Sequence, residues 1–503
     1  MIEFILNNED IATDQPAGMT VLDFVRYYKD LKGTKIGCRE GDCGACAVLV
    51  GELKNGRAAY RSMTSCLMPL ANAAGKHIVT IEGVNAADGS LTHVQQAMID
   101  ENGTQCGFCT VGFVMSLTCF CIDATPKTPE MAVSSVDGNI CRCTGYKSIE
   151  RAANILCQQL ADGGQQYVPN YFADIPQRLA SVNGRTKQAE TRAVASVPFV
   201  AGGTDVYVQK PDELNGSDAV HVFYDESLRG IRDLGDTIEV GASVTVTDLL
   251  ESPAMNAAFP NLYKHLKLVS STPIRNMATL AGNFVNASPI GDMTIWFLAL
   301  NAEITLESHA PLPASPNGEA ATRTIPLRRL FLDYKQLEKL PDEYITAIRF
   351  KKPTADHHFN FEKLSKRTYL DIATVNTAIL LKCESLPGKT WTPPALSDTS
   401  SPPYEGGVAA ALGGRSGSLT DSVEYLILDA HVSAGGVAPI PLYLRETSSF
   451  LVGRTVNEET IEKANEIMQL EISPISDVRG TEEYKRLLLR QLFRAHFLEL
   501  FEA

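Results

Sequence analysis

Three cysteines lie within nine residues, Cys38, Cys43 and Cys46, and a fourth, Cys66, follows twenty residues later. This C-x4-C-x2-C…C run is the plant-type spacing of ligands to a [2Fe–2S] cluster. Three glycines stand beside these cysteines, where a β-carbon would keep backbone N–H groups from turning toward sulfur. A zinc ribbon, which prefers paired C-x2-C units, and buried structural thiols are the alternatives. Spacing and glycines together favour the cluster.

A second set of four cysteines forms a C-x2-C pair and, thirty-one residues later, a C-x-C pair: Cys106, Cys109, Cys141 and Cys143. Alone, this pattern fits zinc, a redox dithiol or an iron–sulfur centre. Residues 108–122 carry no charge and predict a buried helix that begins at the first pair, and further helices are expected over 129–136 and 148–161. Two pairs at the heads of helices can bind one metal centre between them, so the chain suggests two centres in series.

The segments CREGDCGACAVLV, QCGFCTVGFVMS and NICRCTGYKSI resemble the two iron–sulfur segments of the molybdenum hydroxylases, the xanthine dehydrogenase group. The resemblance implies that Cys38, Cys43, Cys46 and Cys66 hold one [2Fe–2S] cluster. It implies that Cys106, Cys109, Cys141 and Cys143 hold the other. Gln105 matches a family glutamine that contacts the molybdopterin cofactor, which would lie on another polypeptide.

The N-terminal third divides by its pattern into three parts. Residues 1–84 predict a small mixed β domain, with Lys54-Asn55-Gly56 as a hairpin turn. Residues 85–162 predict a helical domain. Residues 163–195 are polar and irregular, and we expect them to form a surface linker.

A glycine-rich loop follows the linker, where a short strand runs into Ala201-Gly202-Gly203-Thr204-Asp205. Consecutive backbone N–H groups in such a turn can cradle pyrophosphate, and a plain β-turn is an equally good interpretation of this loop alone. Neither the G-x-G-x-x-G nor the G-x-x-x-x-G-K-[ST] pattern occurs. A second small and polar loop lies within 278–292, and two such loops can hold a long dinucleotide from two sides.

PFVAGGTDV and TLAGNFVNASPIGD resemble the pyrophosphate loops of the family's FAD domain, which is of the vanillyl-alcohol-oxidase type. The implied FAD contacts are Phe199, Val200, Ala201, Gly202, Gly203, Thr204, Asp205, Val206, Thr279, Gly282, Asn283, Ser288 and Asp292. Ile345 and Lys363 match FAD-facing positions too, but a core strand residue and a solvated lysine are equally good interpretations. The run KLSKRTYLDIA is closer to xanthine dehydrogenases than to carbon monoxide dehydrogenases, which favours purine substrates.

The expected fold class is therefore α+β and multidomain: a plant-ferredoxin-like β-grasp domain, a helical-bundle [2Fe–2S] domain, an FAD domain over 196–355 and an α+β flavoprotein C-terminal domain over 356–503. Residues 385–420 are rich in Pro, Ser and Gly and predict a flexible surface insertion.

Charge and cysteine usage restrict partners and location. A formal net charge of −14 disfavours nucleic acid and anionic membranes as partners. No apolar run is long enough to span a membrane, and MIEFILNNED does not resemble a signal peptide. Eight thiols committed to clusters favour a reducing compartment, so we expect a cytoplasmic protein.

The resemblance implies the electron-transfer subunit of a xanthine dehydrogenase. Electrons from hypoxanthine or xanthine, oxidised to urate at a molybdopterin centre, would pass through two clusters to FAD and NAD+, because flavin links one-electron carriers to hydride acceptors. A large molybdopterin-binding subunit is the implied partner, in a dimer of heterodimers, and no catalytic residue is assigned to this chain. An aldehyde or N-heterocycle hydroxylase is the nearest alternative, and a zinc-stabilised interaction protein is the alternative of a different class.

Overall fold

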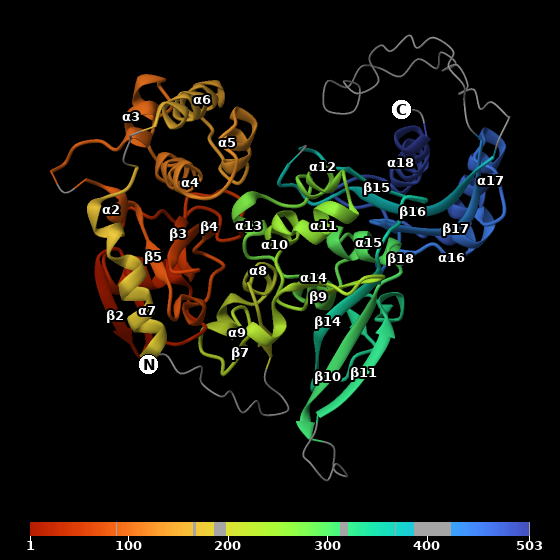
Figure 1. The fold of residues 1–503 in the computed structure, drawn as a ribbon, viewed down its shortest axis with the longest axis horizontal. Helices are drawn as coiled ribbons and strands as arrows, with labels where there is room; N and C mark the ends of the chain where they lie inside the picture. Colours follow the sequence, from red (N-terminus) through yellow and green to blue (C-terminus); the bar gives the residue numbers. More distant parts are fainter. Residues whose placement is uncertain are drawn as a thin grey trace.

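The computed structural model describes residues 1–86, 88–163, 167–185, 198–311, 320–367, 369–386 and 424–501. The chain crosses the molecule in sequence order (Figure 1). The two N-terminal units lie on one side, the unit that begins at 198 lies in the middle, and the C-terminal unit lies on the other side.

A five-stranded mixed sheet forms the first unit, with strand order β2-β1-β5-β3-β4. Its strands are β1 (Ile2–Leu6), β2 (Glu9–Thr13), β3 (Ala47–Lys54), β4 (Arg57–Thr64) and β5 (His77–Val79), and the short helix α1 (Val21–Asp23) follows β2. Strand β1 runs parallel to β5, whereas the other neighbours are antiparallel. Asn55 and Gly56 both have positive φ in the turn between β3 and β4, as a two-residue hairpin requires, so the predicted hairpin is confirmed.

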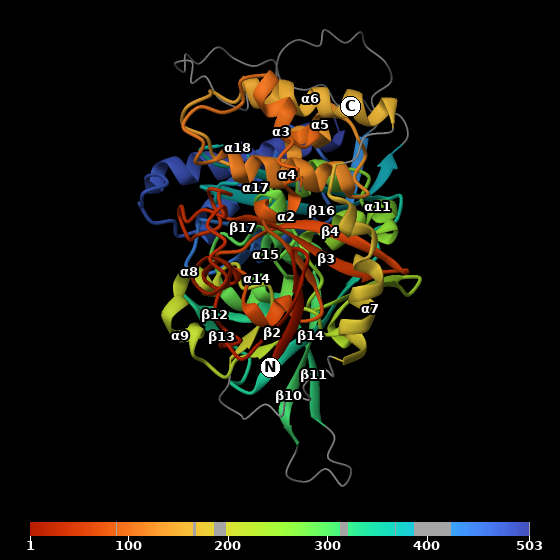
Figure 2. The same cartoon turned by 90° about the vertical axis from the view of Figure 1, so that its left-hand side faces the viewer.

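Helices form the second unit: α2 (Ile81–Val84), α3 (His93–Asp100), α4 (Thr110–Ile122), α5 (Pro129–Ser135) and α6 (Lys147–Asp162). Helix α4 is buried on both sides. Met115 and Cys119 pack against the first sheet, and Phe113 and Phe120 pack against the other helices. This explains why its sequence is apolar all round and confirms the predicted buried helix. Figure 2 shows the bundle above β3 and β4, with α4 nearest to the sheet.

The segment 163–195 is not irregular throughout, and that expectation is wrong for its middle. Helix α7 (Ile175–Arg185) packs its apolar side chains Ile175, Leu179 and Val182 on Ile5 of the first sheet. These three residues follow helical spacing, but the polar residues around them concealed the pattern. Residues 164–166 and 186–195 lie outside the described part of the chain.

The middle unit has a small lobe and a larger sheet. The lobe holds the parallel pair β6 (Phe199–Val200) and β7 (Val220–His221), with α8 (Val206–Gln209) and α9 (Pro211–Asn215). The sheet has the order β11-β10-β14-β9-β8, made of β8 (Ile231–Asp233), β9 (Thr237–Gly241), β10 (Glu303–Pro311), β11 (Ala320–Pro326) and β14 (Glu343–Lys351). The pair β12 (Phe331–Asp333) and β13 (Gln336–Leu337) stands apart from it. The further helices of this unit are α10 (Val246–Glu251), α11 (Pro253–Ala258), α12 (Leu262–Leu266), α13 (Thr272–Arg275), α14 (Leu280–Asn286) and α15 (Asp292–Ala299).

In the C-terminal unit, the described residues form an antiparallel sheet of order β15-β16-β17-β18 and three helices. Its elements are β15 (His357–Leu364), β16 (Val375–Leu386), β17 (Glu424–Gly435), β18 (Leu442–Tyr443), α16 (Arg445–Leu451), α17 (Glu458–Glu471) and α18 (Glu482–Phe501). Of the predicted insertion 385–420, all but the first two residues lie outside the described part of the chain.

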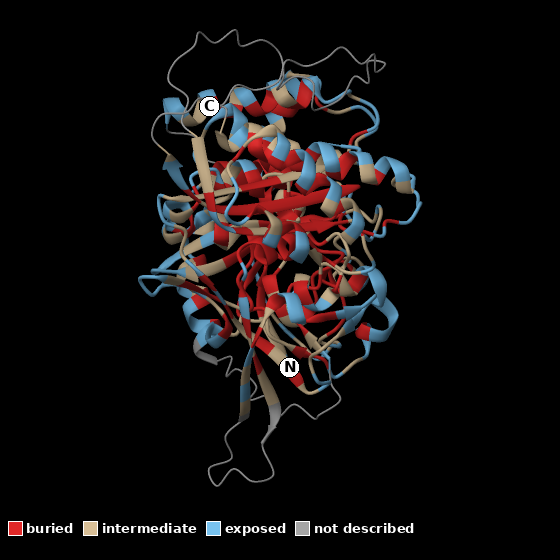
Figure 3. Cartoon of the chain, turned by 90° about the vertical axis from the view of Figure 1, so that its right-hand side faces the viewer, coloured by how far each residue is buried: buried red, intermediate tan, exposed pale blue. Residues whose placement is uncertain are grey.

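One apolar core crosses from the first unit into the middle unit. Cys66 and Leu67 of the first unit pack in the same cluster as Val200, Tyr207 and Met277 of the middle unit. Buried residues fill the centre of the molecule in Figure 3. The first cysteine group is therefore packed directly against the unit that carries the glycine loop.

Candidate functional site

The first cysteine group lies in two loops of the first unit. Cys38, Cys43 and Cys46 precede β3, and Cys66 follows β4. The backbone N–H of Glu40 donates to Cys38 Sγ at 3.3 Å, and the N–H of Cys38 donates to Cys43 Sγ at 3.4 Å. N–H groups turned toward sulfur in this way stabilise thiolate charge.

Glycine is needed beside these sulfurs. A β-carbon at Gly37 would lie 2.6 Å from Cys43 Sγ, which is too close for any side chain. At Gly41, with φ +81°, it would meet the ends of the Leu67 and Ile274 side chains at 2.7 Å. The glycines that the sequence placed beside the ligands therefore serve close packing around the sulfurs, as expected.

The four sulfurs form two pairs. The Cys43 side chain, hydrogen-bonded to Cys38, lowers the pKa of the Cys38 thiol to about 5, and the same bond raises the pKa of Cys43. Cys46 and Cys66 share a corresponding bond, which lowers the pKa of Cys46 and raises that of Cys66. Each pair thus favours one thiolate, the form that binds metal.

The second cysteine group lies at the heads of two helices, with Cys106 and Cys109 before α4 and Cys141 and Cys143 before α6. Cys106 Sγ and Cys143 Sγ are 3.7 Å apart and exposed, and Cys109 pairs with Cys141. Burial raises the pKa of the Cys141 thiol, but hydrogen bonds, among them those from the side chain and backbone of Thr144, lower it by more, so the pKa of Cys141 falls below its usual value.

Two pairs of thiols suit a two-iron cluster, in which each iron takes two protein ligands. A structural zinc ion instead gathers four ligands around one point. The paired geometry of both cysteine groups therefore fits the predicted [2Fe–2S] clusters.

Two hydrogen bonds join the loop of the first cysteine group to the segment just before Cys141. The N–H of Ile140, next to Cys141, donates to the carbonyl oxygen of Cys43 at 3.1 Å. Asn139 Nδ2 donates to the carbonyl oxygen of Gly44 at 3.2 Å. Gly44 has φ +66°, and a β-carbon there would lie 2.4 Å from Gly138 O, so glycine permits this approach.

A cavity of about 450 Å³ opens in the middle unit, within the range of organic-ligand sites. Its lining includes Phe199, Val200, Ala201, Gly202, Gly203, Thr204, Asp205, Val206, Thr279, Gly282, Asn283 and Ile345, all of them predicted FAD contacts. The two predicted loops meet backbone to backbone, because a β-carbon at Gly202 would lie 1.7 Å from the carbonyl oxygen of Met277. Residues of both predicted loops thus line one cavity, and a glycine loop of this kind can present backbone N–H groups to a pyrophosphate.

Several lining residues were not identified from the sequence. The ring of Tyr344 stacks on that of Phe199, with centroids 4.8 Å apart. Lys210, Lys335 and Lys339 also line the cavity, and Lys335 Nζ donates to Asn286 Oδ1 at 2.9 Å. Their charge suits a phosphate-bearing ligand. No motif marks isolated lysines of this kind in a sequence.

Three predicted FAD residues are not among those that line the cavity. Lys363 Nζ lies 2.7 Å from Asp292 Oδ2 and donates to the carbonyl oxygen of Leu268 at 2.8 Å. Asn376 Nδ2 donates to Asp292 Oδ1 at 2.6 Å, and Ser288 Oγ accepts from the N–H of Ile290. Lys363 is therefore not a solvated lysine. Gln105 is exposed, next to Cys106.

Within the part of the chain that the structure describes, no helix combines the length and apolar character needed to cross a bilayer.

Four family models match the chain in succession. They are a 2Fe-2S iron-sulfur cluster binding domain at 4–71, a [2Fe-2S] binding domain at 80–154, an FAD binding domain in molybdopterin dehydrogenase at 178–353 and a CO dehydrogenase flavoprotein C-terminal domain at 408–500. The predicted fold class is confirmed, with two [2Fe–2S]-binding domains, an FAD-binding domain and the flavoprotein C-terminal domain.

The chain is similar to xanthine dehydrogenase 1 of Arabidopsis thaliana, with 25% identity over 96% of this chain and 38% of that protein. It is similar to xanthine dehydrogenase of Emericella nidulans, with 28% identity over 76% of this chain and 33% of that protein. The chain thus spans less than half the length of these relatives. A solved structure of CO dehydrogenase from Oligotropha carboxidovorans is 24% identical, with a TM-score of 0.46 over 60% of this chain and 88% of that chain. With its cysteine pairs, its glycine-loop cavity and the four matching domains, the chain belongs to the molybdenum hydroxylase family, of which it carries the iron–sulfur and FAD domains.

Proposed function

We propose that this chain carries electrons from a molybdopterin centre on a partner polypeptide, first to the Cys106 group, then to the Cys38 group, and finally to FAD and NAD+. The contact between the first cysteine group and the cavity supports this most directly. A β-carbon at Gly203 would lie 2.5 Å from the carbonyl oxygen of Leu67, the residue after Cys66. Asn72 Nδ2 donates to the carbonyl oxygen of Ala201 at 2.9 Å.

The chain's own residues position and tune the carriers. Backbone N–H groups directed at Cys38 and Cys43 would stabilise thiolate, and the burial of Cys46 and Cys66 would keep water from that side of the first centre. The glycine loop and Thr279 would hold the pyrophosphate of FAD. When bound, FAD supplies the conversion between one-electron carriers and a hydride acceptor.

The similarity to xanthine dehydrogenases over most of this chain supports hypoxanthine and xanthine as substrates of the whole complex, with urate as product. We further propose that the molybdopterin centre lies on a large partner subunit and that the complex is a dimer of heterodimers. Gln105, exposed beside Cys106, would face that cofactor. An aldehyde or N-heterocycle hydroxylase would use the same electron path with another substrate.

Anaerobic purification of the full chain, from cells able to assemble such centres, tests the proposal. We expect four iron atoms, four acid-labile sulfides and one FAD per chain, and bleaching of the visible bands by dithionite. Colourless protein that contains zinc and no flavin would contradict the proposal. NADH added to the loaded chain should reduce the flavin if nicotinamide is the acceptor. A screen of purines, aldehydes and N-heterocycles on the co-purified complex then identifies the substrate.

A further inference from the structure

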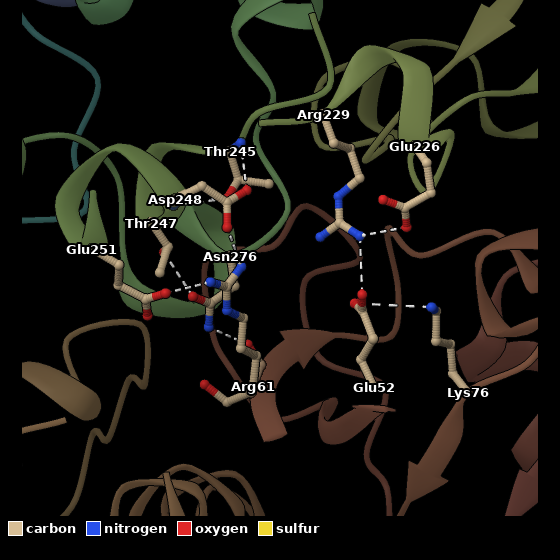
Figure 4. A network of polar contacts seen from close by, with 11 residues as sticks. Glu52, Arg61, Lys76, Glu226, Arg229, Thr245, Thr247, Asp248, Glu251 and Asn276 are labelled. Carbon is tan, nitrogen blue, oxygen red and sulfur yellow. Dashed lines mark hydrogen bonds and ion pairs between the residues drawn. The ribbon is translucent and has the colours of Figure 1, made fainter. Parts of the chain in front are cut away.

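A network of charged side chains crosses the interface between the first unit and the middle unit (Figure 4). Arg61 of β4 projects toward α10, where its Nη1 lies 2.8 Å from Asp248 Oδ1 and its Nη2 lies 2.6 Å from Glu251 Oε2. The side chains of Arg61 and Asp248 are only 18% and 21% exposed. Salt screens such partly buried pairs less than it screens surface pairs.

A second branch of the network lies beside the first. Glu52 of β3 accepts from Arg229 Nη1 of the middle unit at 2.9 Å, and its other oxygen lies 3.8 Å from Lys76 Nζ. Lys76 Nζ also lies 3.8 Å from the centre of the Tyr224 ring, and the Arg229 guanidinium is 5.5 Å from it. Both branches anchor the β3–β4 hairpin of the first unit.

Direct contacts continue along β4 toward the cavity. Asn276 Nδ2 donates to the carbonyl oxygen of Ser62 at 2.8 Å, and its Oδ1 accepts from Thr247 Oγ1. Thr64 Oγ1 lies 3.6 Å from Met277 Sδ. Immediately after β4, the chain reaches Cys66 and then Leu67, which meets the glycine loop. The strand that Arg61 fixes is thus followed directly by the proposed cluster ligand Cys66 and by Leu67, whose carbonyl oxygen lies against Gly203 of the glycine loop.

Burying a charged pair costs free energy, since each ion loses hydration. The two units already share an apolar core, so adhesion alone does not require these pairs. Apolar contacts are non-directional. The planar guanidinium of Arg61, by contrast, donates to its two carboxylates only when they lie in a particular orientation. The network therefore restricts the angle and distance between the units more than it adds adhesion.

We propose that Arg61 is a positioning residue for electron transfer, which holds the first cluster at a fixed distance from FAD. This inference rests on the proposed function. In the step concerned, two electrons leave reduced [2Fe–2S] centres one at a time and enter the flavin, which takes up protons from solvent. The clusters are oxidised and the flavin is reduced, and Arg61 neither gains nor loses an electron or a proton.

Pulse radiolysis of the full chain, loaded with both clusters and FAD, measures this step. A short pulse of reducing radicals supplies the electrons, and their later redistribution between clusters and flavin is followed in separate absorption bands. The variant Arg61→Gln removes both ion pairs, and Arg61→Lys keeps the charge. Arg494→Gln is the matched control, because its ion pair with Glu458 lies wholly within the C-terminal unit.

For Arg61→Gln we expect unchanged iron, sulfide and FAD content and a redistribution rate lower by on the order of tenfold, as small misplacements of reacting groups cost large factors in rate. Arg61→Lys should recover part of that loss, and Arg494→Gln should match the wild type. A wild-type rate in Arg61→Gln with full cofactor content would overturn the inference.

If Arg61→Gln does not retain its cofactors, Glu251→Gln provides the second test, because it removes the more exposed of the two partners. We then expect a smaller but measurable slowing, and an unchanged rate would overturn the inference. Failure of the proposed function looks different, since the wild-type chain would then contain no clusters or flavin, or would show no redistribution at all.

Discussion

The buried ion pair between Lys363 and Asp292 allows a quantitative test of what these two residues do. The Lys363 side chain is 1% exposed, and its ammonium group lies on the Asp292 carboxylate. Replacing Lys363 by Met leaves that carboxylate inside the protein without its cation. Breaking a buried pair from one side costs about 3–5 kcal/mol of unfolding free energy.

Trp296 reports on this region, because it lies one helical turn after Asp292 in α15 and packs on Phe359 of β15, the strand of Lys363, at 4.7 Å between ring centroids. The chain has two tryptophans, so a Trp391→Phe background isolates its fluorescence. Urea unfolding is measured without flavin, since bound ligand adds its own stabilisation. With a slope of about 3 kcal/mol per M, the midpoint of Lys363→Met should fall by roughly 1–2 M.

The double variant Lys363→Met/Asp292→Asn completes the cycle. Because it leaves no unpaired charge, it should be more stable than the sum of the two single losses predicts. If the urea midpoint of Lys363→Met instead stays within about 0.3 M of the background while FAD binding weakens, the pair contributes to cofactor binding and not to stability. The reasoning from burial would then be refuted, and the contact expected from the sequence would stand.

Three further predictions concern the clusters, the cavity and pH. Cys43→Ser should abolish one EPR-active cluster and leave FAD bound, and joint loss of the flavin would show that the two sites are not independent. Gly203→Ala should weaken FAD binding in an equilibrium titration, because φ +82° costs a β-carbon about 1–2 kcal/mol and Leu67 O blocks its space. Burial lowers the pKa of His77 to about 4 and that of His496 to about 3, from 6.5. The unfolded chain therefore binds these protons first, so stability is fully present above about pH 6.5 and is lost as the pH falls toward 4. A denaturation series between these pH values that shows no decline would contradict this.

The cysteine pairs and the glycine loops could be predicted because their chemistry is local. The predicted ligands Cys38 and Cys43 are close in the chain, so spacing alone restricts their geometry. The same holds for the hairpin at Asn55 and Gly56, where two positive φ angles demand these residues.

Contacts between distant segments could not be predicted in this way. Arg61 and Asp248 are 187 residues apart, and neither lies in a recognisable motif. Family likeness suggested that Asp292 and Lys363 both face FAD, but it did not predict the ion pair between these two residues of different units. Helix α7 was missed because its three core residues are spread among polar ones.

The two cysteine groups differ in exposure, and this difference should affect how fast oxygen damages each centre. Cys46 and Cys66 are buried in the core that the first and middle units share, and Cys38 and Cys43 are half-buried, whereas Cys106 and Cys143 lie at the surface. Oxidants reach exposed thiolates first. An unaccompanied chain should therefore lose iron in two stages, the outer centre within the early stage and the inner one later, and only a covering protein would protect the outer one.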